Sequence, residues 1–158
     1  VRLRFLVMEW QREVYEYPWQ KYPGFALAWR DDGWATFEEQ LVAIKNLTVG
    51  KGGQLVVLMI PFGPQLEENF LARDRAYVLK PQKIMASLCN KHGIPVLDVF
   101  DDMRKGGGPN LYYDTLHLTS KGHKIVGDVL LQHLAGNEIF QSWRPDSESA
   151  SAVNSATD

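Results

Sequence analysis

Four segments of the chain have apolar residues at the three-to-four-residue spacing of an amphipathic helix. They are residues 2–17, about 34–49, about 77–92 and about 120–134. Three of the predicted helices also carry end signals. Thr36 followed by Glu39 resembles a capping box, Gly93 follows the third segment as a helix stop, and Thr119 precedes the last segment as a cap.

Two short apolar runs predict strands. In residues 54–60, Gln54 is followed by six consecutive apolar residues, and the run stops at Pro61. A run of this length suits a strand that is buried on both faces. Residues 94–99 form a second run, with Pro95 at its entry, where a missing donor is tolerated. The alternation of helices and strands predicts an α/β fold with 54–60 and 95–99 as adjacent parallel strands.

The predicted sheet is small for this fold class. Open parallel sheets have about five or six strands, and an apolar strand such as 54–60 is expected to have a neighbour on each side. Only one neighbour is visible in the sequence. We therefore expect a fold that is incomplete at the amino terminus, with one edge of strand 54–60 unpaired.

The segments between these elements carry loop residues. Pro18 and the Pro23-Gly24 pair break the first helix, residues 61–69 hold two prolines and a glycine, and the run 105–110 of three glycines and a proline predicts a flexible loop. Residues 144–158 are rich in serine, alanine and aspartate, which predicts a disordered tail. Residues 1–143 are then expected to belong to one domain.

Composition limits the classes of partner and environment that the sequence predicts. The chain has 158 residues, 45% of them hydrophobic, and a net charge of −2, so nothing in its charge predicts binding to nucleic acid. No apolar run reaches the roughly 18 residues that a transmembrane helix needs. The single cysteine, Cys89, has no internal disulfide partner and lies in an apolar run, where a buried structural thiol is expected.

The pair Asp114 and His117 carries the candidate chemistry. An acid three residues before a histidine, on a loop that enters a capped helix, can place its carboxylate about 2.6–3.2 Å from imidazole Nδ1. The other ring nitrogen is then available to take a proton from a hydroxyl nucleophile. The alternative is a capping aspartate beside a structural histidine. A metal site with His123 as third ligand lacks the spacing of histidines on one helix face, and a packing or hydrogen-bonding role is favoured for His123.

The segment Asp114-Thr115-Leu116-His117-Leu118-Thr119-Ser120-Lys121-Gly122-His123 resembles the last conserved block of the SGNH/GDSL hydrolase family. That block reads Asp-x-x-His-hydrophobic-Ser/Thr-x-x-Gly-His/Tyr. The upstream order is also similar to this family: an apolar strand ending in Pro61, a Gln65-Leu66 loop, and a helix followed by Gly-Ile-Pro-Val-Leu-Asp at residues 93–98. The resemblance covers roughly residues 34–134.

The resemblance implies a three-layer α/β/α, flavodoxin-like fold with a parallel sheet, of which this chain is the carboxy-terminal half. It implies ester hydrolysis by a Ser-His-Asp mechanism, with His117 as general base and Asp114 orienting it. The Gly-Asp-Ser block with the nucleophile and the blocks that build the oxyanion hole are not found, so the chain alone is expected to be inactive. No metal or organic cofactor is implied.

The resemblance leaves the substrate open between acetylated carbohydrate, lipid and small acyl esters. Secreted, periplasmic and cell-envelope locations all agree with it, and the oligomeric state is open. Ligands of open α/β sheets lie beyond the carboxyl ends of strands, which makes Phe62 and Gln65 candidates for lining the substrate cleft. Tyr113, next to Asp114, is a third candidate. For all three, the alternative is ordinary loop packing.

Two rival interpretations remain at this point. One is a non-catalytic binding or scaffolding domain that has kept a hydrolase-like fold. The other is part of an unrelated doubly wound protein, in which Asp114 and His117 are structural and their side chains point apart.

Overall fold

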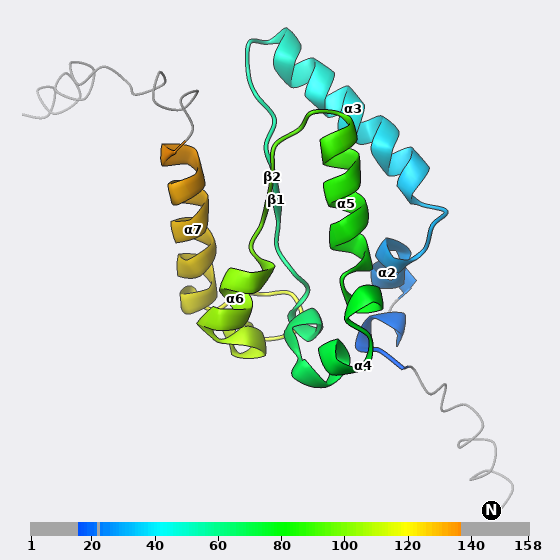
Figure 1. The fold of residues 1–158 in the computed structure, drawn as a ribbon, viewed down its shortest axis with the longest axis vertical. Helices are drawn as coiled ribbons and strands as arrows, with labels where there is room; N and C mark the ends of the chain where they lie inside the picture. Colours follow the sequence, from blue (N-terminus) through cyan, green and yellow to red (C-terminus); the bar gives the residue numbers. More distant parts are fainter. Residues whose placement is uncertain (1–15, 22, 137–158) are drawn as a thin grey trace, which may run out of the picture.

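The structure of the chain, a computed structural model, describes residues 16–21 and 23–136. Most of these residues are helical, and two short strands form one parallel pair (Figure 1). The predicted tail 144–158 and all but the last two residues of the predicted helix 2–17 lie outside the described residues. The predicted domain of residues 1–143 therefore lies only partly within the described residues, and it stays a prediction.

The elements begin with three short turns of helix: the 3-10 helix Pro18–Lys21, α2 (Pro23–Ala26) and the 3-10 helix Leu27–Trp29. There follow α3 (Trp34–Gly50), β1 (Val57–Met59), the 3-10 helix Gly63–Leu66, α4 (Glu68–Val78), α5 (Lys80–Lys91) and β2 (Val96–Asp98). The chain ends its described part with α6 (Phe100–Gly106), the 3-10 helix Gly108–Leu111 and α7 (Ser120–Ala135).

The two strands pair as predicted. β1 and β2 run parallel, with Val57 opposite Val96 and Met59 opposite Asp98. Both are shorter than the apolar runs that predict them. The α/β character is confirmed, and the sheet of the described residues has these two strands alone. The three-layer α/β/α fold with a larger parallel sheet stays a prediction.

The helix ends agree with the sequence in two places and differ in one. Gly93 takes a φ of +60° after α5, a left-handed conformation that suits glycine at a helix stop. Thr119 caps α7, its hydroxyl oxygen accepting the Gly122 N–H at 3.2 Å. The capping box at Thr36 is wrong: α3 already begins at Trp34, after Gly33, and has no side-chain cap.

The predicted helix at about 77–92 is α5, which begins at Lys80 with Pro81 in its first turn. The helix α4, which ends at Val78, was not predicted, and its first residues fall within the loop predicted at 61–69. The flexible loop predicted at 105–110 is largely helical. α6 reaches Gly106 because Phe100 and Met103, one turn apart, are both buried in the core.

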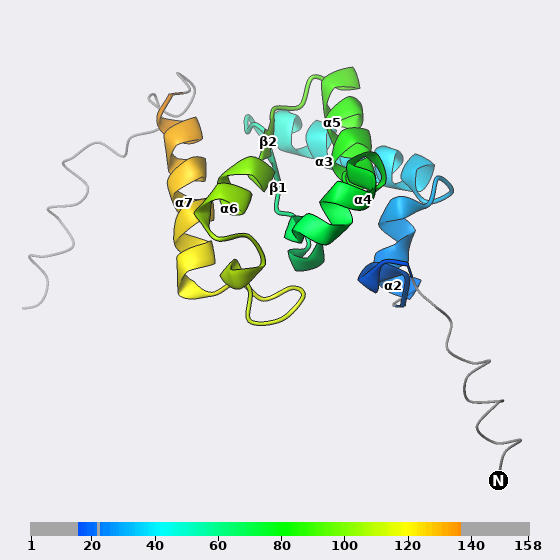
Figure 2. The same cartoon turned by 60° about the horizontal axis from the view of Figure 1, so that its bottom comes forward.

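Helices lie on both sides of the strand pair. Figures 1 and 2 agree in placing α3 and α5 on one side of β1 and β2, and α6 and α7 on the other. The larger buried cluster includes Trp19, Leu66 and Met103, and a smaller one joins Leu41, Cys89 and Ile94. Cys89 is thus a buried structural thiol, as predicted, and burial raises its pKa.

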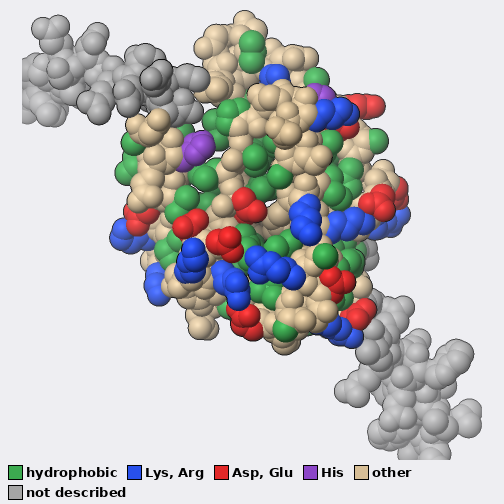
Figure 3. All heavy atoms as spheres, viewed as in Figure 1, with side chains coloured by type: hydrophobic (Ala, Val, Ile, Leu, Met, Phe, Trp, Pro, Cys, Tyr) green, Lys and Arg blue, Asp and Glu red, His purple; other side chains and the backbone are tan. Residues whose placement is uncertain are grey.

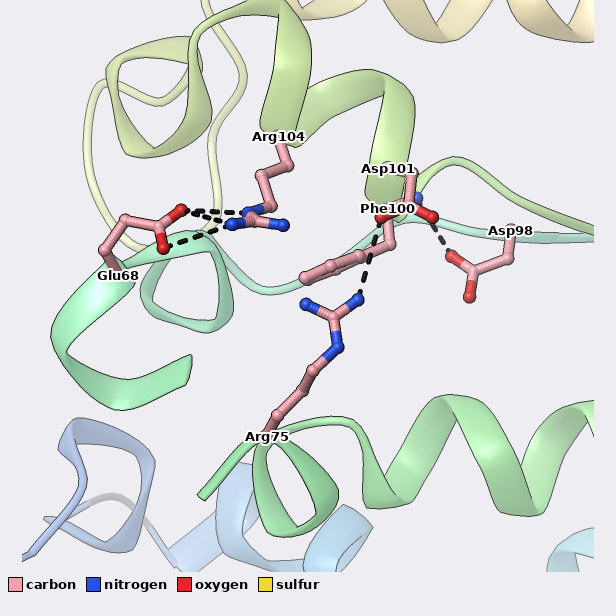
Figure 4. Close-up of polar contacts among 6 residues, drawn as sticks. All are labelled: Glu68, Arg75, Asp98, Phe100, Asp101 and Arg104. Carbon is pink, nitrogen blue, oxygen red and sulfur yellow. Dashed lines mark hydrogen bonds and ion pairs between the residues drawn. The ribbon is translucent and has the colours of Figure 1, made fainter. Parts of the chain in front are cut away.

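Two ion pairs connect α4 and α6 at the surface. The Arg104 guanidinium donates to the two carboxylate oxygens of Glu68 at 2.9 and 3.1 Å, and Arg75 lies 3.7 Å from Asp101 and over the Phe100 ring (Figure 4). Acidic and basic side chains are mixed along the lower half of the face in Figure 3, with hydrophobic side chains above them. Among the described residues, this face therefore shows no large patch of a single charge.

Candidate active site

The candidate residues lie on a loop that folds back on itself between the last 3-10 helix and α7. Tyr112 and Leu118 form an isolated antiparallel bridge. The Tyr113 N–H donates to the His117 carbonyl at 2.8 Å, and the Thr119 N–H donates to the Leu111 carbonyl at 2.8 Å. These bonds close a narrow loop that has Asp114 and His117 at its tip.

Contacts across the fold attach this loop to the carboxyl end of β1. The Tyr112 hydroxyl donates to the Pro61 carbonyl, and burial raises the pKa of Tyr112 to about 12, which keeps that hydroxyl a donor. The Gly63 N–H donates to the Thr115 carbonyl at 3.0 Å. A Cβ on Gly63 would lie 3.2 Å from the same carbonyl oxygen, so the close approach favours glycine.

The other end of the loop is held by the first turn of α7. Gly122 lies so close to the loop that a Cβ there would be 2.6 Å from the Leu111 carbonyl oxygen. Thr119 caps the helix and also donates its hydroxyl to that carbonyl at 3.2 Å. The motif's threonine and glycine therefore have a structural task, which is to seat the loop on α7.

Asp114 and His117 are in direct contact. Asp114 Oδ2 lies 2.7 Å from His117 Nδ1, within the predicted distance, which is thus confirmed. The other oxygen, Oδ1, accepts the backbone N–H groups of Leu116 at 2.7 Å and His117 at 2.8 Å. These two amides, followed by the imidazole, lower the pKa of Asp114 to about 2. The carboxylate is ionised at neutral pH.

The ionised carboxylate determines the imidazole tautomer. Because Asp114 Oδ2 can only accept, Nδ1 carries the hydrogen and Nε2 is left as the basic nitrogen. The His117 side chain is 77% exposed, and no group within the described residues bonds Nε2. The arrangement can therefore take a proton from a group that arrives from outside the loop.

His117 lines a cavity of about 650 Å³ beside the end of β1. Phe62 and Tyr113, two of the three predicted lining residues, also line it. Ile60, Leu116 and His123 line it as well, which sequence reasoning missed. His123, for which packing or hydrogen bonding was expected, is exposed there. Its position on the first turn of α7, six residues after His117, was the sequence feature that could have indicated this cavity.

Gln65, the third predicted lining residue, lies elsewhere. It is 3% exposed and lines a neighbouring cavity rather than the one at His117. Its Oε1 accepts the Phe62 N–H at 2.8 Å, and its Nε2 donates to the Val78 carbonyl at 2.7 Å and to Gln82 at 2.9 Å. Its amide is thus engaged in holding the 3-10 helix after β1 against α4 and α5.

The described residues place no serine on the imidazole. Their two serines are Ser87 on α5 and Ser120 at the start of α7, and neither hydrogen-bonds His117. Within the same residues, no three His, Cys, Asp or Glu side chains are grouped as metal ligands. No helix in the described ranges has both the length and the apolar character to cross a membrane.

Comparison with known proteins adds no relative. No protein-family model matches the chain, and no curated protein or solved structure shows significant similarity to it. The interpretation of the site thus depends on the geometry of Asp114 and His117 and on the motif residues around them.

Proposed function

We propose that this chain supplies the acid and the base of a serine ester hydrolase of the SGNH type. The observation that carries the proposal is the 2.7 Å contact between Asp114 Oδ2 and His117 Nδ1, made while Nε2 is left without a described partner beside a cavity. A buried structural histidine would be expected to have both nitrogens bonded to the protein. Here one nitrogen is held and the other is accessible.

In this proposal His117 Nε2 takes the proton of a serine hydroxyl as its oxygen attacks the ester carbonyl. Asp114 holds the imidazole in the required tautomer and stabilises the imidazolium that forms. The proton at Nε2 then passes to the departing alkoxide oxygen. Water, activated by the same nitrogen, attacks the acyl-serine and releases the carboxylic acid.

The nucleophile and the oxyanion donors are proposed to lie on a segment outside residues 16–136. Such a segment would present its serine to the cavity that His117 lines, at the carboxyl end of β1. The apolar walls formed by Ile60, Phe62 and Leu116 support an ester with an apolar part near the reacting carbonyl. Acetylated carbohydrates, lipids and small acyl esters all satisfy that condition.

Ester hydrolysis by two polypeptides tests this function. The 158-residue chain should hydrolyse p-nitrophenyl acetate no faster than its His117→Ala variant. A polypeptide extended upstream through a Gly-Asp-Ser block should hydrolyse it. There His117→Ala should lower kcat on the order of 10⁴- to 10⁶-fold, and Asp114→Asn by up to about 10⁴-fold, because an amide favours the wrong tautomer.

His123→Ala is the matched control, since it removes a second histidine from the same cavity. It should change kcat by less than about tenfold because it is given no part in proton transfer. Excess chelator should leave the activity of the extended protein intact. Hydrolysis by the short chain that survives His117→Ala would contradict the proposal, as would chelator-sensitive activity.

A further inference from the structure

A three-residue segment after β1 holds the base loop, which is the name used here for residues 112–118. The first residue of the segment, Pro61, accepts the Tyr112 hydroxyl with its carbonyl. The third residue, Gly63, donates its N–H to the Thr115 carbonyl at 3.0 Å. The place of the base loop relative to the end of β1 therefore depends on how this segment is itself held.

Phe62, the middle residue of the segment, has both of its backbone polar groups bound by Gln65. Its N–H donates to Gln65 Oε1 at 2.8 Å, and its carbonyl accepts the Gln65 N–H at 2.8 Å. The bond to the carbonyl is a backbone bond of the 3-10 helix, whereas the bond from the N–H needs the amide oxygen of the side chain. The Gln65 side chain therefore fixes the residue that lies between the two attachments of the base loop.

The Gln65 amide is fixed in turn by α4 and α5. Its Nε2 donates to the Val78 carbonyl at 2.7 Å and to Gln82 Oε1 at 2.9 Å, and Gln82 Nε2 donates to Gln65 Oε1 at 3.0 Å. The Phe62 N–H can only donate and the Val78 carbonyl can only accept, so the amide has one allowed orientation. The side chain is 3% exposed, and these bonds are therefore shielded from water.

We infer that Gln65 is a positioning residue for the general base His117, because through Phe62 it holds the segment to which the base loop is attached. The inference rests on the proposed function for the role of the base. It concerns the place of the imidazole relative to the end of β1, since the contact between Asp114 and His117 is closed within the base loop itself. A displacement of about 1 Å can lower a rate by about 10²-fold. Loss of the Gln65 amide should therefore impair catalysis while the Asp114–His117 pair stays intact.

The alternative is that the two glutamines only stabilise the core. Gln65→Met and Gln82→Met each break the bonds between the two side chains and leave the remaining buried amide short of partners, so both variants should destabilise the fold. Gln65 bonds the Phe62 N–H, whereas Gln82 bonds only Gln65 among the contacts described above. The two variants therefore separate a positioning role from a stabilising one.

The first test is amide hydrogen exchange of the 158-residue chain, measured by NMR, which needs no ester hydrolysis. Rates are compared with those of the amides that pair β1 with β2, because these report the loss of overall stability. On that scale Gln65→Met should speed exchange of the Gly63 amide by more than about tenfold, although its own acceptor is unchanged, and Gln82→Met by less than about threefold. The Asp114 carboxyl should keep its pKa of about 2 in both variants.

The second test is ester hydrolysis by the polypeptide extended upstream through a Gly-Asp-Ser block. Gln65→Met should lower kcat for p-nitrophenyl acetate by about 10- to 100-fold, with KM changed by less than about threefold. Gln82→Met should lower kcat by less than about threefold. Gln65→Glu retains an oxygen for the Phe62 N–H, and burial favours its neutral form, so it should recover most of the kcat that Gln65→Met loses.

Three results would overturn the inference. An unchanged Gly63 rate in Gln65→Met, or an equal rise in both variants, would show that the glutamines only stabilise the core. An Asp114 midpoint moved toward 3.8 in Gln65→Met would show that the residue acts on the pair and not on its place. An unchanged kcat in an active extended Gln65→Met protein would show that the position does not limit the rate. If the extended protein with native Gln65 hydrolyses no ester, the proposed function fails instead, and Gly63 exchange still decides whether Gln65 holds the base loop.

Discussion

Three N–H groups hold the Asp114 carboxylate, although the side chain is 55% exposed. An exposed acid paired with one long basic side chain is usually mobile, and such pairs contribute little. Asp114 differs because two of its donors are backbone amides of its own loop, at Leu116 and His117. The backbone therefore orients the carboxylate, and the carboxylate in turn orients the imidazole.

The lowered pKa of Asp114 predicts a pH dependence. Its pKa falls from 3.8 to about 2 on folding, so the carboxylate contributes stability that is complete above the unfolded value and is lost as the pH falls through about 2. A ¹³C-NMR titration of the carboxyl group should show its midpoint near the lower value. The Leu116 and His117 amides should gain solvent exchange over the same pH range.

A midpoint near 3.8 in that titration would show that the loop amides do not bind the carboxylate in solution. The Asp114→Asn variant identifies the signal, because it should remove this titration and leave those of the other carboxyl groups.

Within α7, two glycines have opposite surroundings. A Cβ on Gly122 would lie 2.6 Å from the Leu111 carbonyl oxygen, whereas a Cβ on Gly127 would have nothing within 4 Å. Gly122→Ala should therefore lower the free energy of unfolding by about 1–3 kcal/mol through overpacking. Gly127→Ala should raise it by about 1 kcal/mol, because alanine is the better helix former. Chemical denaturation measures both.

The two variants control for each other, since they make the same change in one helix. A loss of stability in both would indicate that α7 is not helical as described. A gain in both would show that the loop is not seated against Gly122, and the close approach of Leu111 would then be wrong.

At the scale of the whole molecule, burial rather than surface charge holds the helices on the two sides of β1 and β2. Met103 and Arg104 are neighbours on α6: Met103 is 0% exposed in the larger core, and Arg104 pairs with Glu68 on the surface. Met103→Ala should cost about 2–5 kcal/mol in unfolding free energy. Arg104→Ala should cost less than about 1 kcal/mol.

Thermal and chemical denaturation of these two variants compares the stability contributed by a core residue with that contributed by its surface neighbour. If Arg104→Ala lowered the free energy of unfolding more than Met103→Ala, the ion pairs between α4 and α6 would stabilise the fold more than the burial of α6 does.

Sequence patterns located α3, α7, the parallel pairing of β1 with β2, and the Asp114–His117 contact. Each of these depends on residues close in sequence or on an apolar run of distinctive length. The patterns missed α6, because seven residues of which the last is a glycine give too little periodicity to be distinguished from a loop. They also made Gln65 a candidate for lining the substrate cleft, because its residue type and position after a strand do not show that its amide bonds Val78 and Gln82.

The sequence by itself determined part of the local structure: where α3, α5 and α7 run, where the apolar strands lie, and that a carboxylate three residues before His117 can reach its ring. Only the tertiary structure decided what those pieces face. The Tyr112–Pro61 bond, between residues 51 apart, brings the loop to the end of β1, and helices packed around β1 leave its free edge inside a cavity. The physical reason is range. Hydrogen bonds within a turn follow from spacing, whereas a cavity depends on how distant segments pack, which no local pattern specifies.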